Sequence, residues 1–277
     1  MAIDEKRLPI VVLLDASGSM LFEARDKNET KLDAANRFIC EFIELCAGHY
    51  KAGKRADICF VQFTDEVILS TDFHDINDLG NHIMRKRPPH SSCGKIAWKK
   101  MDVSVKDQNG AVIGTKRINF PHFAISEYDN GTNIGKAVLH GIERINERIE
   151  ESSGYPPYFP FLILVSDGHN PAPNQCASGD DLTSQREAIS KLRDRASTGK
   201  NECNLIIPLV VPVGDTSNIA RLRQYLGDFE SGEIPCEMHH THIMNFIARL
   251  MEYSITQSTS RTSLQDLPGP EPFNYDD

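Results

Sequence analysis

The sequence predicts an α/β fold, with a doubly wound, mainly parallel sheet and helices on both faces in the manner of Rossmann-like folds. Short, continuously apolar runs at residues 10–14 and 161–165 are typical of strands that are buried on both faces. Segments with apolar residues at spacings of three and four alternate with these runs, which is the pattern of amphipathic helices. Strands that alternate with helices favour a parallel sheet.

The elements follow in a regular order along the chain. Thr30 and Asp33 have the spacing of a capping box at the start of the first helix, and a tight turn at Thr64-Asp65 joins two neighbouring strands. Strands are expected at residues 10–14, 57–63, 66–70, 161–165, 205–213 and 233–237, and helices at 31–49, 75–86, 136–151, 183–196, 217–226 and 241–256.

Residues 88–126 interrupt this alternation. Apolar and β-branched residues flank Asn109-Gly110, which is a turn signal between paired strands. We therefore expect an inserted β-hairpin within a single domain that covers residues 1–256. The polar residues 257–277 contain several prolines and are expected to be a disordered tail.

Composition restricts the partners. The net charge of −9 argues against a nucleic acid or an anionic membrane as the main partner, because both require clustered lysine and arginine. The longest apolar run, residues 205–213, is far shorter than the roughly 20 residues of a membrane span. The first residues lack an apolar signal region, and none of the seven cysteines forms a CxxC pair, so we expect a reduced, cytoplasmic protein.

Polar residues gather where predicted strands end. Asp15, Ser17 and Ser19 directly follow the first strand, Asp167 follows the strand at 161–165, and Thr132 precedes a helix. In doubly wound sheets, ligands bind at the carboxyl ends of the strands, so the three stretches can converge there. Hydroxyl and carboxylate oxygens suit a hard cation such as Mg²⁺, with Mn²⁺ or Ca²⁺ as alternatives.

The same five residues carry a family resemblance. The sequence is similar to the von Willebrand factor A (VWA) family, whose metal-ion-dependent adhesion site has the pattern Asp-x-Ser-x-Ser, a later threonine and a later aspartate. The resemblance covers roughly residues 8–256, with 88–126 as an insertion. It implies that the serines and the threonine touch the metal, that the aspartates act largely through water, and that the metal takes an Asp or Glu of a partner protein.

A narrower likeness is to the bacterial tellurium-resistance-associated members of that family. It rests on Gly131-Thr132-Asn133-Ile134-Gly135, on the aromatic and proline residues of 155–161, and on Val211-Pro212-Val213-Gly214-Asp215. It implies a role in stress response, signalling or defence, with a protein kinase or a phosphatase as the partner.

Each part of the pattern also has a plain interpretation. Asp-x-Ser-x-Ser and Asp167-Gly168 are common turn sequences after a strand, Thr132 suits a helix N-cap, and His169 is either at the rim of the site or an exposed loop residue. The three parts in this order, each at the right kind of junction, favour a metal site.

A non-enzymatic, metal-dependent binding module is the expected function. The alternative is a Mg-dependent hydrolase or phosphoryl-transfer enzyme, since an aspartate after a strand suits phosphoaspartate chemistry. Ser17 stands where a second aspartate would be expected, and neither a P-loop nor a Gly-x-Ser-x-Gly motif is present. A scaffold with an unused site is a third possibility.

Overall fold

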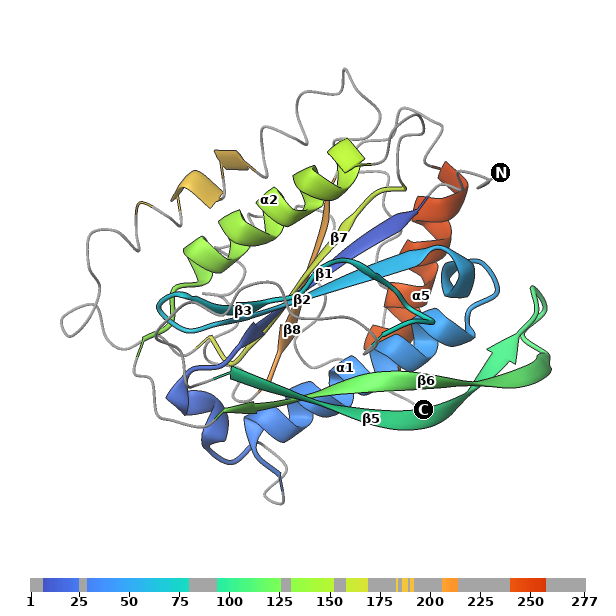
Figure 1. Cartoon of the computed structure of the whole chain (residues 1–277), viewed down its shortest axis with the longest axis horizontal. Coiled ribbons are helices and arrows are strands. Elements are labelled where there is room, and N and C mark those ends of the chain that lie inside the picture. The colour runs from blue at the N-terminus through green and yellow to red at the C-terminus, as the bar shows by residue number, and fades with distance from the viewer. Residues whose placement is uncertain are drawn as a thin grey trace, which may run out of the picture.

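The structure is a computed structural model that describes residues 7–24, 29–79, 94–125, 131–151, 158–168, 183, 186–188, 190–191, 206–213 and 240–257. These ranges form a mixed α/β structure in which a mainly parallel sheet lies between helices (Figure 1). This arrangement is compatible with a Rossmann-like fold. Among the helices of the described part, none combines the length and the apolar character needed to cross a membrane.

The central sheet has the strand order β3-β2-β1-β7-β8, and β4 is a further partner of β2. β1 pairs in parallel with β2 and β7, and β7 pairs in parallel with β8, whereas β3 and β4 run antiparallel to β2. All residues of β1, β2 and β7 are buried, as the apolar runs predicted for β1 and β7. The bounds are β1 (Leu8–Asp15), β2 (Ala56–Phe63), β3 (Val67–Ser70), β4 (His74–Asp75), β7 (Phe161–Ser166) and β8 (Ile207–Pro212).

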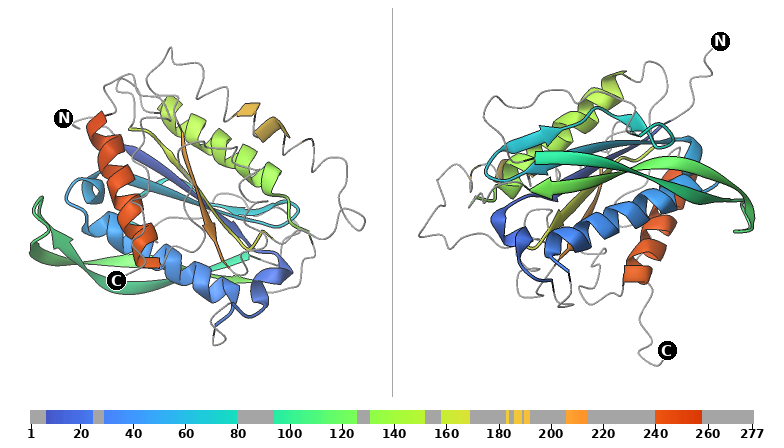
Figure 2. Two further views of the ribbon diagram at one scale, coloured as in Figure 1. Left: turned by 180° about the vertical axis from the view of Figure 1, so that it is seen from behind. Right: turned by 60° about the horizontal axis from the view of Figure 1, so that its bottom comes forward.

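Helices pack on both faces of this sheet. Figure 2 shows α2 (Ile134–Glu151) on one face and α1 (Lys31–Gly48) and α5 (His240–Gln257) on the other. Alternate residues of β1 serve the two faces: Val11 and Leu13 belong to the apolar cluster under α2, and Ile10 and Val12 to the cluster under α1. α2 approaches the sheet closely at Gly141, where a Cβ would lie 2.6 Å from Leu162 Cδ1.

A long β-hairpin lies outside the central sheet, along α1 (Figure 1). Its strands, β5 (Gly94–Lys106) and β6 (Val112–Ile125), are antiparallel, and Gly110 in the connecting turn has the left-handed φ of 81° that glycine tolerates best. Asn36 of α1 fixes the hairpin because its side chain donates to Phe123 O and accepts from Phe123 N. The hairpin expected within 88–126 is therefore present, while residues 88–93 and 126 lie outside the described part.

One predicted element is wrong where the structure describes it. The helix expected at residues 75–86 does not form at 75–79. Asp75 belongs to β4 and pairs with Asp57 of β2, and residues 76–79 form turns. The Asp75 carboxylate accepts from Asn77 N and from Arg7, so local and long-range hydrogen bonds replace the helical ones.

Several expected segments lie outside the described residues. These are residues 80–86, the helix at 217–226, the strand at 233–237 and residues 258–277 of the expected tail. Of the helix at 183–196, the described positions are helical. α5 ends at Gln257, one residue beyond the domain boundary that the sequence predicted.

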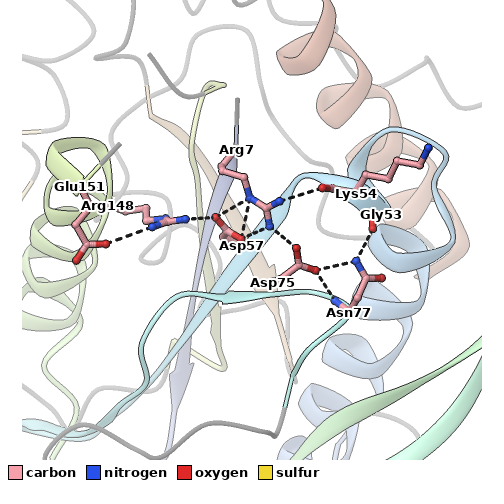
Figure 3. Close-up of polar contacts among 8 residues, drawn as sticks. All are labelled: Arg7, Gly53, Lys54, Asp57, Asp75, Asn77, Arg148 and Glu151. Atoms are coloured by element: carbon pink, nitrogen blue, oxygen red, sulfur yellow. Dashed lines mark hydrogen bonds and ion pairs between the residues drawn. The ribbon is translucent and has the colours of Figure 1, made fainter. Parts of the chain in front are cut away.

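Ion pairs tie the strands and α2 together at the edge of the sheet where β1 and β2 begin (Figure 3). Asp57, which is 2% exposed, receives hydrogen bonds from Arg7 Nε at 3.0 and 3.1 Å and from Arg148 Nη2 at 2.6 Å. Arg7 also donates to Asp75 at 2.6 Å. One buried carboxylate thus joins the start of β1, the start of β2 and the end of α2.

Candidate metal site

The first aspartate of the pattern lies at the opposite edge, at the carboxyl end of β1. Asp15 is fully buried. Its Oδ1 accepts from Ser17 N at 2.9 Å, and its Oδ2 accepts from Ser166 Oγ at 2.6 Å. Ser166 Oγ in turn accepts from Gly168 N at 3.0 Å. Asp15 therefore fixes both the loop that follows β1 and the loop that follows β7.

The two serines of the pattern lie side by side. Ser17 precedes the short helix η1 (Gly18–Leu21), in which Met20 N donates to Ser17 O at 3.0 Å. The Met20 side chain is fully buried and holds this turn against the core. As a result, Ser17 Oγ and Ser19 Oγ are 3.1 Å apart, so the two hydroxyls can face a common ligand.

The second aspartate of the pattern is paired with a lysine. Asp167 Oδ2 accepts from Lys31 Nζ at 2.6 Å, and the Asp167 side chain is fully buried. Burial and the nearby charge of Asp167 raise the pKa of Asp15 from its ordinary 3.8 to about 6, although hydrogen bonds from Ser166 and Ser17 offset part of this rise. The structure thus brings two carboxylates together in a buried place with one ammonium, and the remaining negative charge is costly unless a further cation compensates for it.

Thr132 lies at the same edge, and its backbone neighbours fix it there. Asn133 N donates to Thr64 O at 2.8 Å, just beyond the end of β2, and Ala16 N donates to Phe63 O at 2.8 Å. Asn133 also caps α2, because its side chain accepts from Lys136 N at 2.9 Å. The N-cap role that the sequence offered as the plain interpretation of Thr132 therefore belongs to Asn133, and Thr132 is buried beside it.

Of the residues that the sequence predicted, Asp15, Ser17, Ser19 and Asp167 are brought together by hydrogen bonds and charge. Thr132 is buried at the same edge of the sheet. His169, the expected rim residue, lies outside the described residues.

The donor atoms of this cluster fit a hard cation. Two carboxylates and several hydroxyls supply only oxygen, which Mg²⁺ and Ca²⁺ prefer, whereas structural zinc sites use nitrogen and sulfur. In the described part of the chain, no group of three or more His, Cys, Asp or Glu side chains could hold a metal. Any cation at this edge would therefore rely on the hydroxyls as well as on the two aspartates.

Sequence reasoning missed two residues of this site. Ser166 orients Asp15 across the β1–β7 pairing, and nothing in its sequence context indicates that role. Lys31 carried a weak signal: it is the first residue of α1, where the helix dipole favours acidic side chains and disfavours cations.

The similarity of this chain to known proteins is low. No family model matches the sequence, and no curated protein matches it. Among solved structures, the PilB minor pilin from Streptococcus sanguinis is similar over 97% of this chain and 64% of its own, with 15% identity and a TM-score of 0.45. Its D319A mutant is similar over 58% of this chain and 29% of its own, with 14% identity and a TM-score of 0.34.

A further likeness is to the conserved hypothetical protein BatB from Bacteroides thetaiotaomicron, over 78% of this chain and 96% of its own, with 13% identity and a TM-score of 0.33. This chain thus spans less than two thirds of the length of the two pilin structures. At these identities and TM-scores, the likenesses define neither the family nor the function of the chain.

Proposed function

We propose that the chain is a divalent-metal-dependent protein-binding module of the VWA type. A cation bound by the hydroxyls of Ser17, Ser19 and Thr132, with Asp15 and Asp167 acting largely through water, would take a carboxylate of a partner protein as its remaining ligand. The observation that carries the proposal is the buried pair of carboxylates, Asp15 and Asp167, beside two hydroxyls that are 3.1 Å apart.

The wider features of the proposal follow from the sequence. They are a doubly wound VWA-type arrangement, one domain over residues 1–256 and a cytoplasmic location. The likeness to tellurium-resistance-associated proteins supports a partner in stress response, signalling or defence, such as a kinase or a phosphatase.

The contacts of Asp15 support binding over phosphoryl transfer. Both of its oxygens accept hydrogen bonds, one from the Ser17 backbone and one from the Ser166 hydroxyl. These contacts suit a residue that orders two loops around a ligand. A carboxylate nucleophile would instead need an oxygen aimed at the phosphorus of a substrate.

The proposal is tested by affinity purification from the native host with the wild-type protein and the Asp15→Ala variant, each with Mg²⁺ and with chelator. We expect the wild-type protein to retain a partner only when Mg²⁺ is present and Asp15→Ala to retain none. Asp102→Ala is the matched control, because it removes an exposed carboxylate of the hairpin and should bind as the wild-type protein does.

Circular dichroism shows whether each variant is folded, and Asp15→Asn replaces Asp15→Ala if the latter unfolds. Equal recovery of the same partner by the Asp15 variant, or recovery that chelator leaves unchanged, contradicts the proposal.

A further inference from the structure

Lys31 occupies a position that is unfavourable in two respects. It is the first residue of α1, directly after the N-cap Thr30, where the positive end of the helix dipole repels a cation. Its side chain is only 16% exposed, so the ammonium loses much of its hydration. The ion pair with Asp167 compensates for both costs, because Lys31 Nζ lies 2.6 Å from Asp167 Oδ2.

The formal charges of the described site residues determine how many anionic ligands a bound cation still needs. Asp15 and Asp167 each contribute −1 and Lys31 contributes +1, so together they carry −1. A divalent cation changes this sum to +1, and one carboxylate from a partner brings it to zero. Without Lys31, the two aspartates alone would neutralise the cation, and a partner carboxylate would leave the site negative.

The structure assigns Lys31 a role in this site: we infer that its ammonium competes with the divalent cation for Asp167 and leaves the loaded site with one excess positive charge. This inference rests on the proposed function and names the residue that makes a partner carboxylate necessary. The lysine weakens metal binding in the absence of a partner, because two cations share one buried carboxylate. It strengthens binding of the acidic ligand, because the excess charge then needs an anion.

A purely structural role for Lys31 makes a different prediction. If the ion pair only attaches α1 to the loop after β7, removing the ammonium lowers stability and leaves metal affinity unchanged or weaker. Stability alone therefore does not separate the two roles, whereas metal affinity does.

The test is a calorimetric titration of Mn²⁺ into chelator-stripped wild-type protein and into Lys31→Met, which keeps an unbranched side chain and removes the charge. We expect Lys31→Met to bind Mn²⁺ about tenfold more tightly. Lys31→Gln, which is neutral but can still donate to Asp167, should bind Mn²⁺ as Lys31→Met does and replaces it if the methionine variant does not fold.

Lys136→Met is the matched control, since Lys136 also lies in the first turn of a helix and pairs with the exposed Glu66. The Mn²⁺ affinity of Lys136→Met should equal that of the wild-type protein.

A second titration adds acetate as the carboxylate probe. Acetate should tighten Mn²⁺ binding to the wild-type protein and should tighten it less in Lys31→Met. Mn²⁺ binding that is equal or weaker in both neutral variants than in the wild-type protein overturns the role of Lys31 and leaves the proposed function standing. Failure of all the proteins to bind Mn²⁺ overturns the proposed function, and the role of Lys31 with it.

Discussion

Replacing Asp15 with asparagine is expected to stabilise the metal-free protein at neutral pH. In the folded chain the pKa of Asp15 is about 6 rather than the ordinary 3.8, so folding favours the neutral carboxyl group. Above pH 6 the folded protein must hold the carboxylate, and the pKa difference corresponds to about 3 kcal/mol of lost stability. Asparagine has the same shape without the charge: its Oδ1 can still accept from Ser17 N, and its Nδ2 can donate to Ser166 Oγ in place of the bond that Asp15 accepts.

The sign of the pH dependence follows from the raised pKa. As pH falls from 7 toward 4, Asp15 of the wild-type protein takes up a proton in the folded state before it does so in the unfolded state. The cost of burying the charged carboxylate is therefore relieved as pH falls. The advantage of Asp15→Asn in the free energy of unfolding should therefore be about 3 kcal/mol at pH 7 and about half of that at pH 5. Comparison of the two proteins at each pH cancels the titration of groups that both contain.

Urea denaturation in the presence of chelator, followed by circular dichroism at pH 7 and pH 5, measures this difference. An Asp15→Asn protein that is equally or less stable than the wild-type protein at pH 7, or an advantage that does not shrink at pH 5, would refute the reasoning. Excess Mg²⁺ should raise the stability of the wild-type protein and leave that of Asp15→Asn nearly unchanged.

Three further substitutions test the fold around the site. Asp57→Ala leaves Arg7 and Arg148 without their shared buried carboxylate and should cost about 3 kcal/mol in urea denaturation; a loss below 1 kcal/mol would mean that solvent screens these pairs. Gly141→Ala places a methyl group against Leu162 and should lower stability by roughly 1–3 kcal/mol, whereas a gain would show that α2 moves away easily. Asn36→Ala removes both hydrogen bonds to the backbone of Phe123 and should cost about 1–3 kcal/mol, with faster amide hydrogen exchange in β6; unchanged exchange there would contradict the role of Asn36 as the attachment of the hairpin.

The parts of the fold that local physics determines were predictable from the sequence. The buried strands β1 and β7 consist of continuous apolar runs, and the capping box of Thr30 and Asp33 forms at the start of α1 as predicted. The approach of Asp15 to Asp167 was also predictable, because residues that follow parallel strands share one edge of a sheet.

The features that depend on tertiary contacts were not predictable. A helix was expected at residues 75–86, but pairing with Asp57 and the charge of Arg7 hold Asp75 in a strand. Ser166 reaches Asp15 only because β7 lies next to β1, and strand order cannot be read from either segment alone. Lys31 finds Asp167 across 136 positions of sequence, so its charge at a helix N-terminus was the only local signal.

The central claim is that oxygen atoms from three separate stretches of the chain hold one divalent cation. A crystal structure grown with Mn²⁺, with data collected to show the anomalous signal of manganese, tests it most directly. We expect one strong anomalous peak at the carboxyl edge of β1, at bonding distance from the hydroxyls of Ser17, Ser19 and Thr132. An anomalous map without a peak there, with Lys31 still paired with Asp167, would contradict the account.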